Sequence, residues 1–282
     1  MEVRPNRGTR RRRAPAASAG LSSITRLVVP LDGSREAESA VDPALRIART
    51  LQVPVELLTV HDPVRGRWAR NVDETAAASA YDHVEVTVVG SGWAGDVIVD
   101  MIAEQAGTVV CMATHNRDRF SRLVAGSVTE YVLHTAPGPV LMVGPSYRSD
   151  HSTDSFRRAM VCLDHGARDD TGIALAQSWA DQLKLELELV HVASTEDDVE
   201  ASEERTARIA DRMADGGASV GHTQLRGSAP AEEVAKLLSR HPGSIAVLAN
   251  RGRVGIARSI LGSVSSRLLE TSPAPLVLTR VP

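Results

Sequence analysis

One phrase occurs twice in this sequence, and the repeat limits the folds that the chain can adopt. An apolar run, a polar loop, a Gly-Ser pair, a helix-like stretch and a proline-led apolar run follow one another over Cys111–Val143 and again over Val247–Thr279. Gly126-Ser127-Val128 matches Gly262-Ser263-Val264 at an offset of 136 (262 minus 126). Solenoid units repeat every 20 to 50 residues or so, whereas a whole domain needs about this length. We therefore expect two copies of one domain.

The beginning of each copy agrees as well. In the first, an apolar strand is expected to end at Asp32, and a helix with apolar residues at Ala40, Ala44, Ile47 and Leu51 follows it. Ser34 is the expected N-cap of that helix, with Ala37 as its N3 residue. In the second copy a strand is expected to end at Asp164, and a helix begins near Asp169.

Strands and helices alternate between these ends. Further strands are predicted over 54–60, 83–89 and 108–113 in the first copy and over 185–192, 218–225 and 244–249 in the second. Helices are predicted near 96–105, 195–214 and 230–239, whereas the weak pattern of 61–80 suggests a short or irregular helix. This alternation predicts an α/β fold in which helices cover both faces of a parallel sheet.

Composition narrows the classes of function and sets the expected domain limits. The net charge of -3 gives no general attraction to nucleic acid, and no apolar run approaches the roughly 18 residues of a membrane helix. Cys111 and Cys162 lie in apolar runs and are expected to be buried free thiols, which fits a cytoplasmic protein. We expect an Arg-rich disordered tail over 1–22 and two domains over 23–147 and 156–282.

Two loops of each copy are candidates for ligand binding, because ligands of open α/β sheets lie beyond the carboxyl ends of the strands. One loop carries the strand-one aspartate, Asp32 or Asp164. The other leads to the Gly-Ser pair, whose backbone amides at a helix start suit phosphate oxygens. Gly-Ser is also an ordinary helix cap, and a single such loop is a weak signal.

These loops resemble those of the universal stress protein family, and the resemblance extends from about Thr25 to Val281. Nucleotide-binding members of that family carry G-x-x-G, nine residues, then G-[ST]. The nine-residue spacing occurs twice here, over 117–125 and 253–261. The resemblance implies two tandem Rossmann-like (adenine nucleotide alpha hydrolase-like) domains, each a five-stranded parallel sheet of order 3-2-1-4-5. It also implies an intramolecular pseudo-dimer that pairs Val140–Val143 with Leu276–Thr279.

The resemblance further implies ATP or another adenine nucleotide as ligand, with Mg²⁺ as a further candidate. Backbone at the end of strand two would meet adenine, the aspartates the nucleoside, and the fourth-strand loops the phosphates. The residues implied are Pro30, Asp32, Val60, Ala113, His115, Asn116, Gly126, Ser127 and Val128 in the first copy, and Asp164, Val192, Ala249, Arg251, Gly252, Gly262, Ser263 and Val264 in the second.

The chain departs from the family motif at the first two glycines. Ala113 and Asn116 hold these positions in the first copy, whereas the second copy has Ala249 but keeps Gly252. If such a position needed φ > 0, alanine there would cost about 1–2 kcal/mol. Because the second copy also carries the cation Arg251, we predict that it binds the nucleotide more tightly.

Three functions remain open at this stage. The first is a cytosolic stress-response regulator that binds adenine nucleotide. The second is a slow ATPase, although no set of nucleophile, base and orienting residue is evident. The third is a scaffold that acts through protein contacts, which the missing glycines favour. A homodimer of the whole chain is a further candidate, whereas a membrane or nucleic-acid partner is not expected. His61, His165 and His191 are predicted to be polar residues at the rim, and no metal site is expected.

Overall fold

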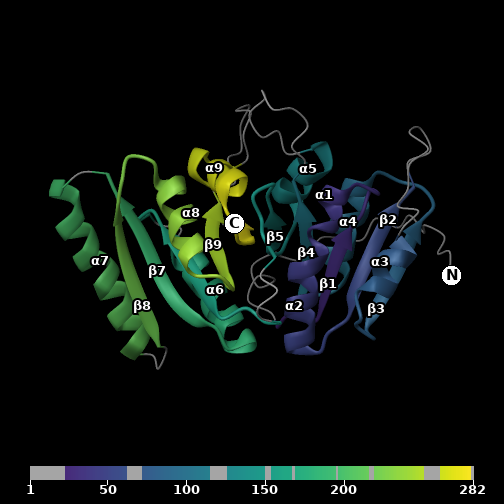
Figure 1. Ribbon diagram of the computed structural model, residues 1–282, viewed down its shortest axis with the longest axis horizontal. Coiled ribbons are helices and arrows are strands. Elements are labelled where there is room, and N and C mark those ends of the chain that lie inside the picture. The colour runs from purple at the N-terminus through teal and green to yellow at the C-terminus, as the bar shows by residue number, and fades with distance from the viewer. Residues whose placement is uncertain are drawn as a thin grey trace.

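The computed structural model describes residues 23–61, 72–114, 126–149, 154–166, 169–194, 196–215, 219–250 and 261–280. Within these residues ten strands form a single sheet (Figure 1). The strands are β1 (Arg26–Pro30), β2 (Val55–Val60), β3 (Val84–Val89), β4 (Thr108–Ala113), β5 (Val140–Val143), β6 (Arg158–Leu163), β7 (Glu186–Ala193), β8 (Val220–Arg226), β9 (Ser244–Asn250) and β10 (Leu276–Arg280). The Arg-rich tail over 1–22 lies outside the described residues, so its disorder stays a prediction.

The order of the strands is β3-β2-β1-β4-β5-β10-β9-β6-β7-β8. Each half therefore has the predicted order 3-2-1-4-5, and the pairs within each half are parallel. We call the half from β1 to β5 domain 1 and the half from β6 to β10 domain 2. The reversal of strand order between the first and fourth strands of each domain, the predicted switch point, is confirmed.

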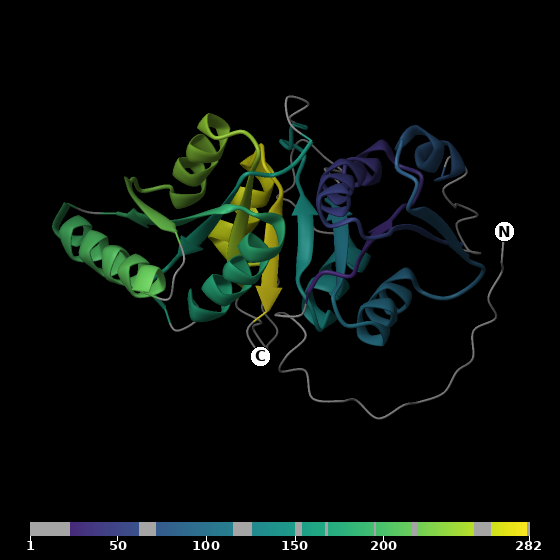
Figure 2. The same ribbon diagram turned by 90° about the horizontal axis from the view of Figure 1, so that it is seen from below.

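The two domains meet through their last strands. β5 and β10 pair antiparallel with the register Val140↔Leu278, Leu141↔Val277 and Met142↔Leu276. The arrowheads of these two neighbouring strands point in opposite directions in Figure 2. This pairing confirms the predicted pseudo-dimer, and it covers two apolar edges that would otherwise be open to aggregation.

Helices cover both faces of the sheet, as the alternation of elements predicted. The helices are α1 (Arg35–Glu38), α2 (Val41–Leu51), α3 (Val72–Ala78), α4 (Ala94–Glu104), α5 (Ser127–Thr135), α6 (Asp169–Leu183), α7 (Glu196–Asp215), α8 (Pro230–Arg240) and α9 (Ser263–Thr271). One buried core contains residues of α1, α2, α3, α6 and α7, and the other contains residues of α4, α5, α8 and α9. Each core is continuous across both domains.

The expected single helix after β1 is in fact two. α1 ends at Glu38, and α2 begins at Val41. Pro43 explains the break, because its ring nitrogen has no hydrogen to donate to the carbonyl of Ser39 and its ring would crowd that carbonyl. Ser34 caps α1 as predicted, since its hydroxyl accepts the amide of Ala37 at 3.2 Å. The first strand ends at Pro30 and its counterpart at Leu163, slightly before the predicted aspartates.

The segment between the domains contacts both of them. On one side the Ser146 hydroxyl donates to the Glu270 carbonyl at 2.7 Å. On the other side the Tyr147 hydroxyl donates to the carboxylate of Asp42 in α2. Arg46 of α2 is buried and lies with its guanidinium 4.1 Å from the centre of the Phe156 ring. The described parts of the connection, on both sides of residues 150–153, are therefore packed against the rest of the protein.

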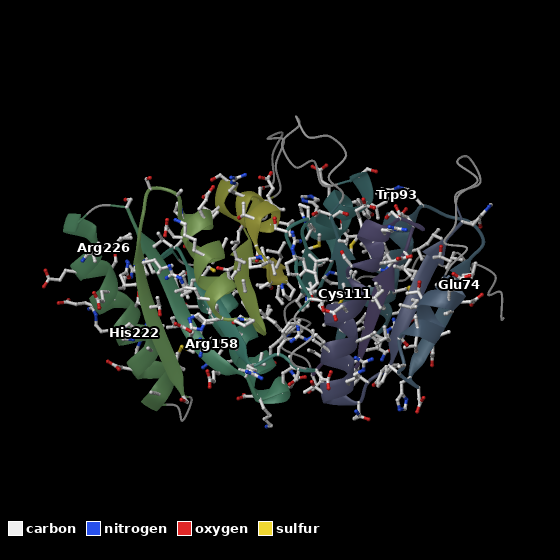
Figure 3. All side chains as sticks on the ribbon, viewed as in Figure 1. Glu74, Trp93, Cys111, Arg158, His222 and Arg226 are labelled. Atoms are coloured by element: carbon white, nitrogen blue, oxygen red, sulfur yellow. The ribbon has the colours of Figure 1, made fainter. Side chains whose placement is uncertain are left out.

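A polar ladder crosses the first three strands of each domain. In domain 1 Arg26 donates to Glu56 at 2.9 Å, and Thr87 donates to the same carboxylate at 2.6 Å. In domain 2 Arg158 lies 3.3 Å from Glu188, which accepts from Thr223 at 2.5 Å. Arg26 and Arg158 are the first residues of β1 and β6, so both ladders begin at the amino end of the first strand of their domain. Figure 3 shows Arg158 in the lower half of the molecule.

Candidate functional site

The carboxyl ends of the first, second and fourth strands bring the predicted loop residues to one edge in each domain. Pro30 pairs with Leu58 and Val28 with Val110, so Asp32, two and four residues on, is level with the ends of β2 and β4. The same register holds in domain 2, where Leu163 pairs with His191 and Val161 with Val247. The structure therefore groups Pro30, Asp32, Val60 and Ala113 at one edge, and Asp164, Val192 and Ala249 at its counterpart.

The two aspartates are exposed, and their loops are built differently. The Oδ1 atom of Asp32 accepts from the backbone amide and the hydroxyl of Ser34, at 3.0 and 2.6 Å. The Oδ1 atom of Asp164 accepts from the amide of Gly166 at 2.8 Å. Each loop thus holds one carboxylate oxygen against its own backbone, which orients the carboxyl group at the strand end.

Gly126 and Gly262 are the N-cap residues of α5 and α9, and neither their backbone conformation nor neighbouring described atoms require a glycine there. Gly126 has φ of -56° and Gly262 has φ of -58°, values that any residue adopts. A Cβ added at either glycine would meet nothing within 4 Å among the described residues. Because these N-cap residues carry no side chain, the amides of the first helical turn receive no capping bond from them. Ser127, Ser263 and Val264 are exposed, and Val128 is half-buried.

The alanines that replace the first motif glycine cause no backbone strain. Ala113 is the last residue of β4 and pairs with Val143, and Ala249 lies in β9 paired with Thr279. Neither residue has a positive φ. A Cβ added at Gly172 of α6 would lie 3.5 Å from the Ala249 methyl group, so that methyl faces the helix. The strain that a left-handed conformation would have imposed does not arise.

Part of the predicted phosphate loop cannot be placed. His115, Asn116, Arg251 and Gly252 lie outside the described residues, as do the arginines of both loops. Their contribution to the site stays a prediction.

The side chains that join α4 to α5 in domain 1 differ in chemistry from those that join α8 to α9 in domain 2. In domain 1 the Tyr131 hydroxyl donates to Asp96 at 2.7 Å, and the Trp93 ring lies edge-on to Tyr131 at 4.4 Å. In domain 2 the matching position, 136 residues on, is Arg267, which bonds Glu232 at 2.7 Å. Trp93 is 43% exposed and lies at the upper edge of domain 1 in Figure 3. The repeat offset could have revealed this exchange of Tyr131 for Arg267.

The predicted rim position of the histidines is wrong for His191. This residue lies inside β7 and is 9% exposed, and its ring stacks on His165 at 3.9 Å with 9° between the planes. The side chain points into the core on the α6 and α7 side, because alternate residues of a strand face opposite sides. His61, just after β2, is half-buried. No sequence signal indicated the stack, since His165 lies in the loop after β6 whereas His191 lies inside β7.

Asp169 is a buried carboxyl group at the start of α6. Its Oδ1 atom accepts from the Asp164 amide at 3.2 Å. Burial, and after it the nearby Asp164 carboxylate, raises the pKa of Asp169 to about 6. Domain 1 has no such group, because Ala37 holds the equivalent position at the same offset of 132 (169 minus 37) that relates Asp164 to Asp32.

Other groups of chemical interest are few in the part of the chain that the structure describes. No cluster of three or more His, Cys, Asp or Glu side chains could hold a metal ion there. Cys111 and Cys162 are free thiols, and burial raises the pKa of both. Among the described residues no helix has the length and apolarity needed to span a bilayer.

Comparison with known proteins decides the family. The model of the universal stress protein family matches residues 23–144 and again 155–280. The chain belongs to the universal stress protein family. A universal stress protein of Mycolicibacterium smegmatis is 23% identical over 289 residues, which cover 90% of this chain and 96% of the relative.

Solved universal stress proteins share this fold. One from Archaeoglobus fulgidus is 18% identical, with a TM-score of 0.65 over 93% of this chain and 98% of its own. A shorter universal stress protein, solved in complex with cAMP, is 21% identical and covers 43% of this chain and 98% of its own, with a TM-score of 0.35. The likeness to the Archaeoglobus fulgidus protein, together with the strand order, confirms the tandem Rossmann-like fold implied by the sequence resemblance.

Proposed function

We propose that each domain of this universal stress protein binds one adenine nucleotide at the carboxyl ends of its strands, and that the protein acts as a cytoplasmic stress-response regulator. The observation that carries the proposal is the pair of glycines at the helix starts. Both copies have glycine here, at Gly126 and Gly262, although neither φ nor a neighbouring described atom requires it. Close approach of a ligand to the backbone gives a reason for it.

The proposed roles follow from the chemistry of each group. First-turn amides of α5 and α9 would donate to phosphate oxygens, with the helix dipole favouring the negative charge. The exposed oxygens of Asp32 and Asp164 would accept from ribose hydroxyls, and backbone groups at Val60 and Val192 would meet adenine. His115, Asn116, Arg251 and Gly252 are proposed at the phosphates, where Mg²⁺ would offset the charge of ATP.

Calorimetry with ATP and Mg²⁺ tests this proposal. Asp32→Ala should weaken one binding event and Asp164→Ala the other, each about 10- to 100-fold, because a hydrogen bond to a charged group is lost. We assign the tighter event to domain 2. Glu36→Ala and Asp170→Ala, which change exposed carboxylates of the following helices, serve as matched controls and should leave both events intact.

Three outcomes would contradict parts of the proposal. If Asp32→Ala alone abolishes the tighter event, the ranking of the domains is wrong. If the wild type binds no adenine nucleotide with or without Mg²⁺, and none is released when the purified protein is denatured, nucleotide binding fails and action through protein contacts replaces it. Steady phosphate release that Asp32→Ala or Asp164→Ala abolishes would make the protein a slow ATPase.

A further inference from the structure

The loop that carries Asp164 in domain 2 is tied to neighbouring elements in a way that its counterpart in domain 1 is not. His165 has φ of 54°, and the equivalent residue in domain 1 is Gly33, with φ of 84°. Both loops therefore use a left-handed residue, which glycine adopts without steric cost and histidine does not. A histidine in this conformation points to contacts made by its side chain that offset the steric cost.

The His165 ring makes two such contacts. It stacks on His191 at 3.9 Å, and its Nε2 atom lies 3.0 Å from the hydroxyl of Thr206 in α7. Thr206 is fully buried, and its single hydroxyl proton is donated to the Ser202 carbonyl at 2.9 Å. The Nε2 atom of His165 must therefore carry the hydrogen and donate it to Thr206. Arg205 of α7 adds a bond to the His165 carbonyl at 2.9 Å.

The second ring is held by Gln224 of β8. The Gln224 side-chain nitrogen lies 3.0 Å from Nδ1 of His191 and donates to it, so this nitrogen of His191 is an acceptor and the ring is neutral. Among the residues that the structure describes, the buried Oε1 atom of Gln224 has no hydrogen-bond partner. Rotation of the amide by half a turn would bring this oxygen to Nδ1, where it would accept a hydrogen from a protonated His191. The pair thus has a second hydrogen-bonded arrangement available.

We propose that the stacked rings of His165 and His191 form a proton-operated latch, which holds the Asp164 loop against α7 while at most one ring is charged and releases it when both are. Two imidazolium rings face to face at this separation repel one another, and solvent screens the repulsion only partly, because His191 is buried and His165 is half-buried. Released, the loop would no longer hold Asp164 in its present orientation. Only the consequence of the latch rests on the proposed function: release of the loop should weaken nucleotide binding by domain 2 at acidic pH.

Titratable and charged side chains on α6, α7 and β8, among the described residues, also affect the protonation of the two histidine rings. Asp164 lies just after β6 and Asp169 at the start of α6. Arg205 lies on α7, and His222 lies on β8, on the sheet face that also carries Gln224. Asp169 loses its negative charge in the same acidic range, which removes an attraction for a charged ring. Domain 1 has Gly33 and Thr59 at the positions of the two rings, so its loop should not respond to acid.

The first experiment observes the latch without any nucleotide. Proton–carbon NMR of the full-length protein follows the imidazole Cε1–H signals from pH 8 to pH 5, assigned with His165→Gly and His191→Thr, which introduce the domain 1 residues. Because the rings repel when charged, each should take up its proton at a pH at least about 0.5 unit higher once the other ring is removed. His191→Gln repeats the test with a side chain close in size. Equal midpoints with and without the partner ring would overturn the latch.

The second experiment measures the consequence for binding. Calorimetry with ATP and Mg²⁺ compares binding at pH 7.5 and pH 5.5 in two variants. Asp32→Ala leaves the domain 2 site intact, and Asp164→Ala leaves the domain 1 site intact. The domain 1 site serves as the control for protonation of the nucleotide itself. We expect domain 2 to weaken about tenfold more than domain 1, and the excess to vanish when His165→Gly and His191→Thr are added. A persistent excess would overturn the regulatory role. Absence of binding to either variant and to the wild type would refute the proposed function, and the NMR result would still decide the latch.

Discussion

Asp169 shows how one residue makes two copies of a domain chemically unequal. Its carboxyl group lies under the Asp164 loop, in the place where domain 1 has the methyl group of Ala37. The buried carboxylate accepts a backbone hydrogen bond, yet its pKa is raised because burial outweighs that bond. At neutral pH the folded protein therefore holds a charge that it would be more stable without.

The stability of the protein should depend on pH through Asp169. A carboxyl group with a raised pKa binds its proton more tightly in the folded than in the unfolded state, so its destabilising effect is absent below about pH 4 and complete above about pH 6. Asp169→Asn should raise the free energy of unfolding by about 1–2 kcal/mol at pH 8, and the gain should disappear at pH 4. Denaturant titrations at both values measure it. Asp170→Asn, an exposed neighbour in the same turn, is the control; an equal gain there would assign the effect to the helix start.

At the level of elements, the polar ladders stabilise the sheet from the amino end of each domain's first strand, while the carboxyl ends bear the candidate sites. The side chains of Arg26 and Glu56 are 17% and 12% exposed, so their ion pair is largely shielded from solvent. Removing one partner leaves the other charge poorly solvated, which costs more than losing an exposed pair. The same arrangement in both domains indicates that it belongs to the fold rather than to one site.

Replacing Glu56 tests this view. Glu56→Gln keeps an acceptor for Thr87 but leaves Arg26 without its counter-ion, and it should lower the free energy of unfolding by about 1–3 kcal/mol. Glu233→Gln breaks a pair with Lys236, whose side chain is 61% exposed, and should cost about 0.5 kcal/mol or less. Chemical denaturation compares the two. Similar losses would show that the ladder gains nothing from its burial.

The sequence predicted whole elements better than the contacts among them. The repeat predicted two copies of one domain, and the family resemblance implied the strand order and the β5–β10 pairing. The break before Pro43 was missed because the apolar spacing continues through it, although the proline itself carried the signal. The His165–His191 stack joins residues 26 positions apart on separate elements (191 minus 165), and no local pattern records such a meeting. The roles of the site residues remain predictions.

The whole molecule depends on a close contact at the domain junction. A Cβ added at Gly144, just after β5, would lie 1.6 Å from the Leu269 carbonyl oxygen, an overlap that only backbone movement can relieve. Gly144→Ala should therefore lower the free energy of unfolding by about 3 kcal/mol. Gly126→Ala places its methyl group in open space among the described residues and should cost about 1 kcal/mol or less. Thermal unfolding of both variants measures the difference, and equal melting temperatures would contradict the assigned contact.

Separating the domains tests the same junction. A chain of residues 1–150 would expose β5, whose apolar residues pair with β10 in the intact protein. We expect this fragment to form a homodimer through β5 or to be insoluble, because an unpaired apolar edge recruits another strand. Light scattering after size exclusion measures its mass. A stable, soluble monomer would show that β5 does not need its partner strand.

The antiparallel pairing of β5 with β10 also has a consequence for the time course of synthesis on the ribosome. Leu278 follows its partner Val140 by 138 residues (278 minus 140), so the ribosome finishes the first half long before the strand that covers it emerges. At about 5–20 residues per second, the wait lasts roughly 7 to 28 seconds. Throughout that interval the nascent chain presents an apolar edge to every other nascent chain of the same polysome. Because both domains belong to one chain, β5 needs no second molecule as its partner, but β5 stays unpaired until β10 has been synthesised.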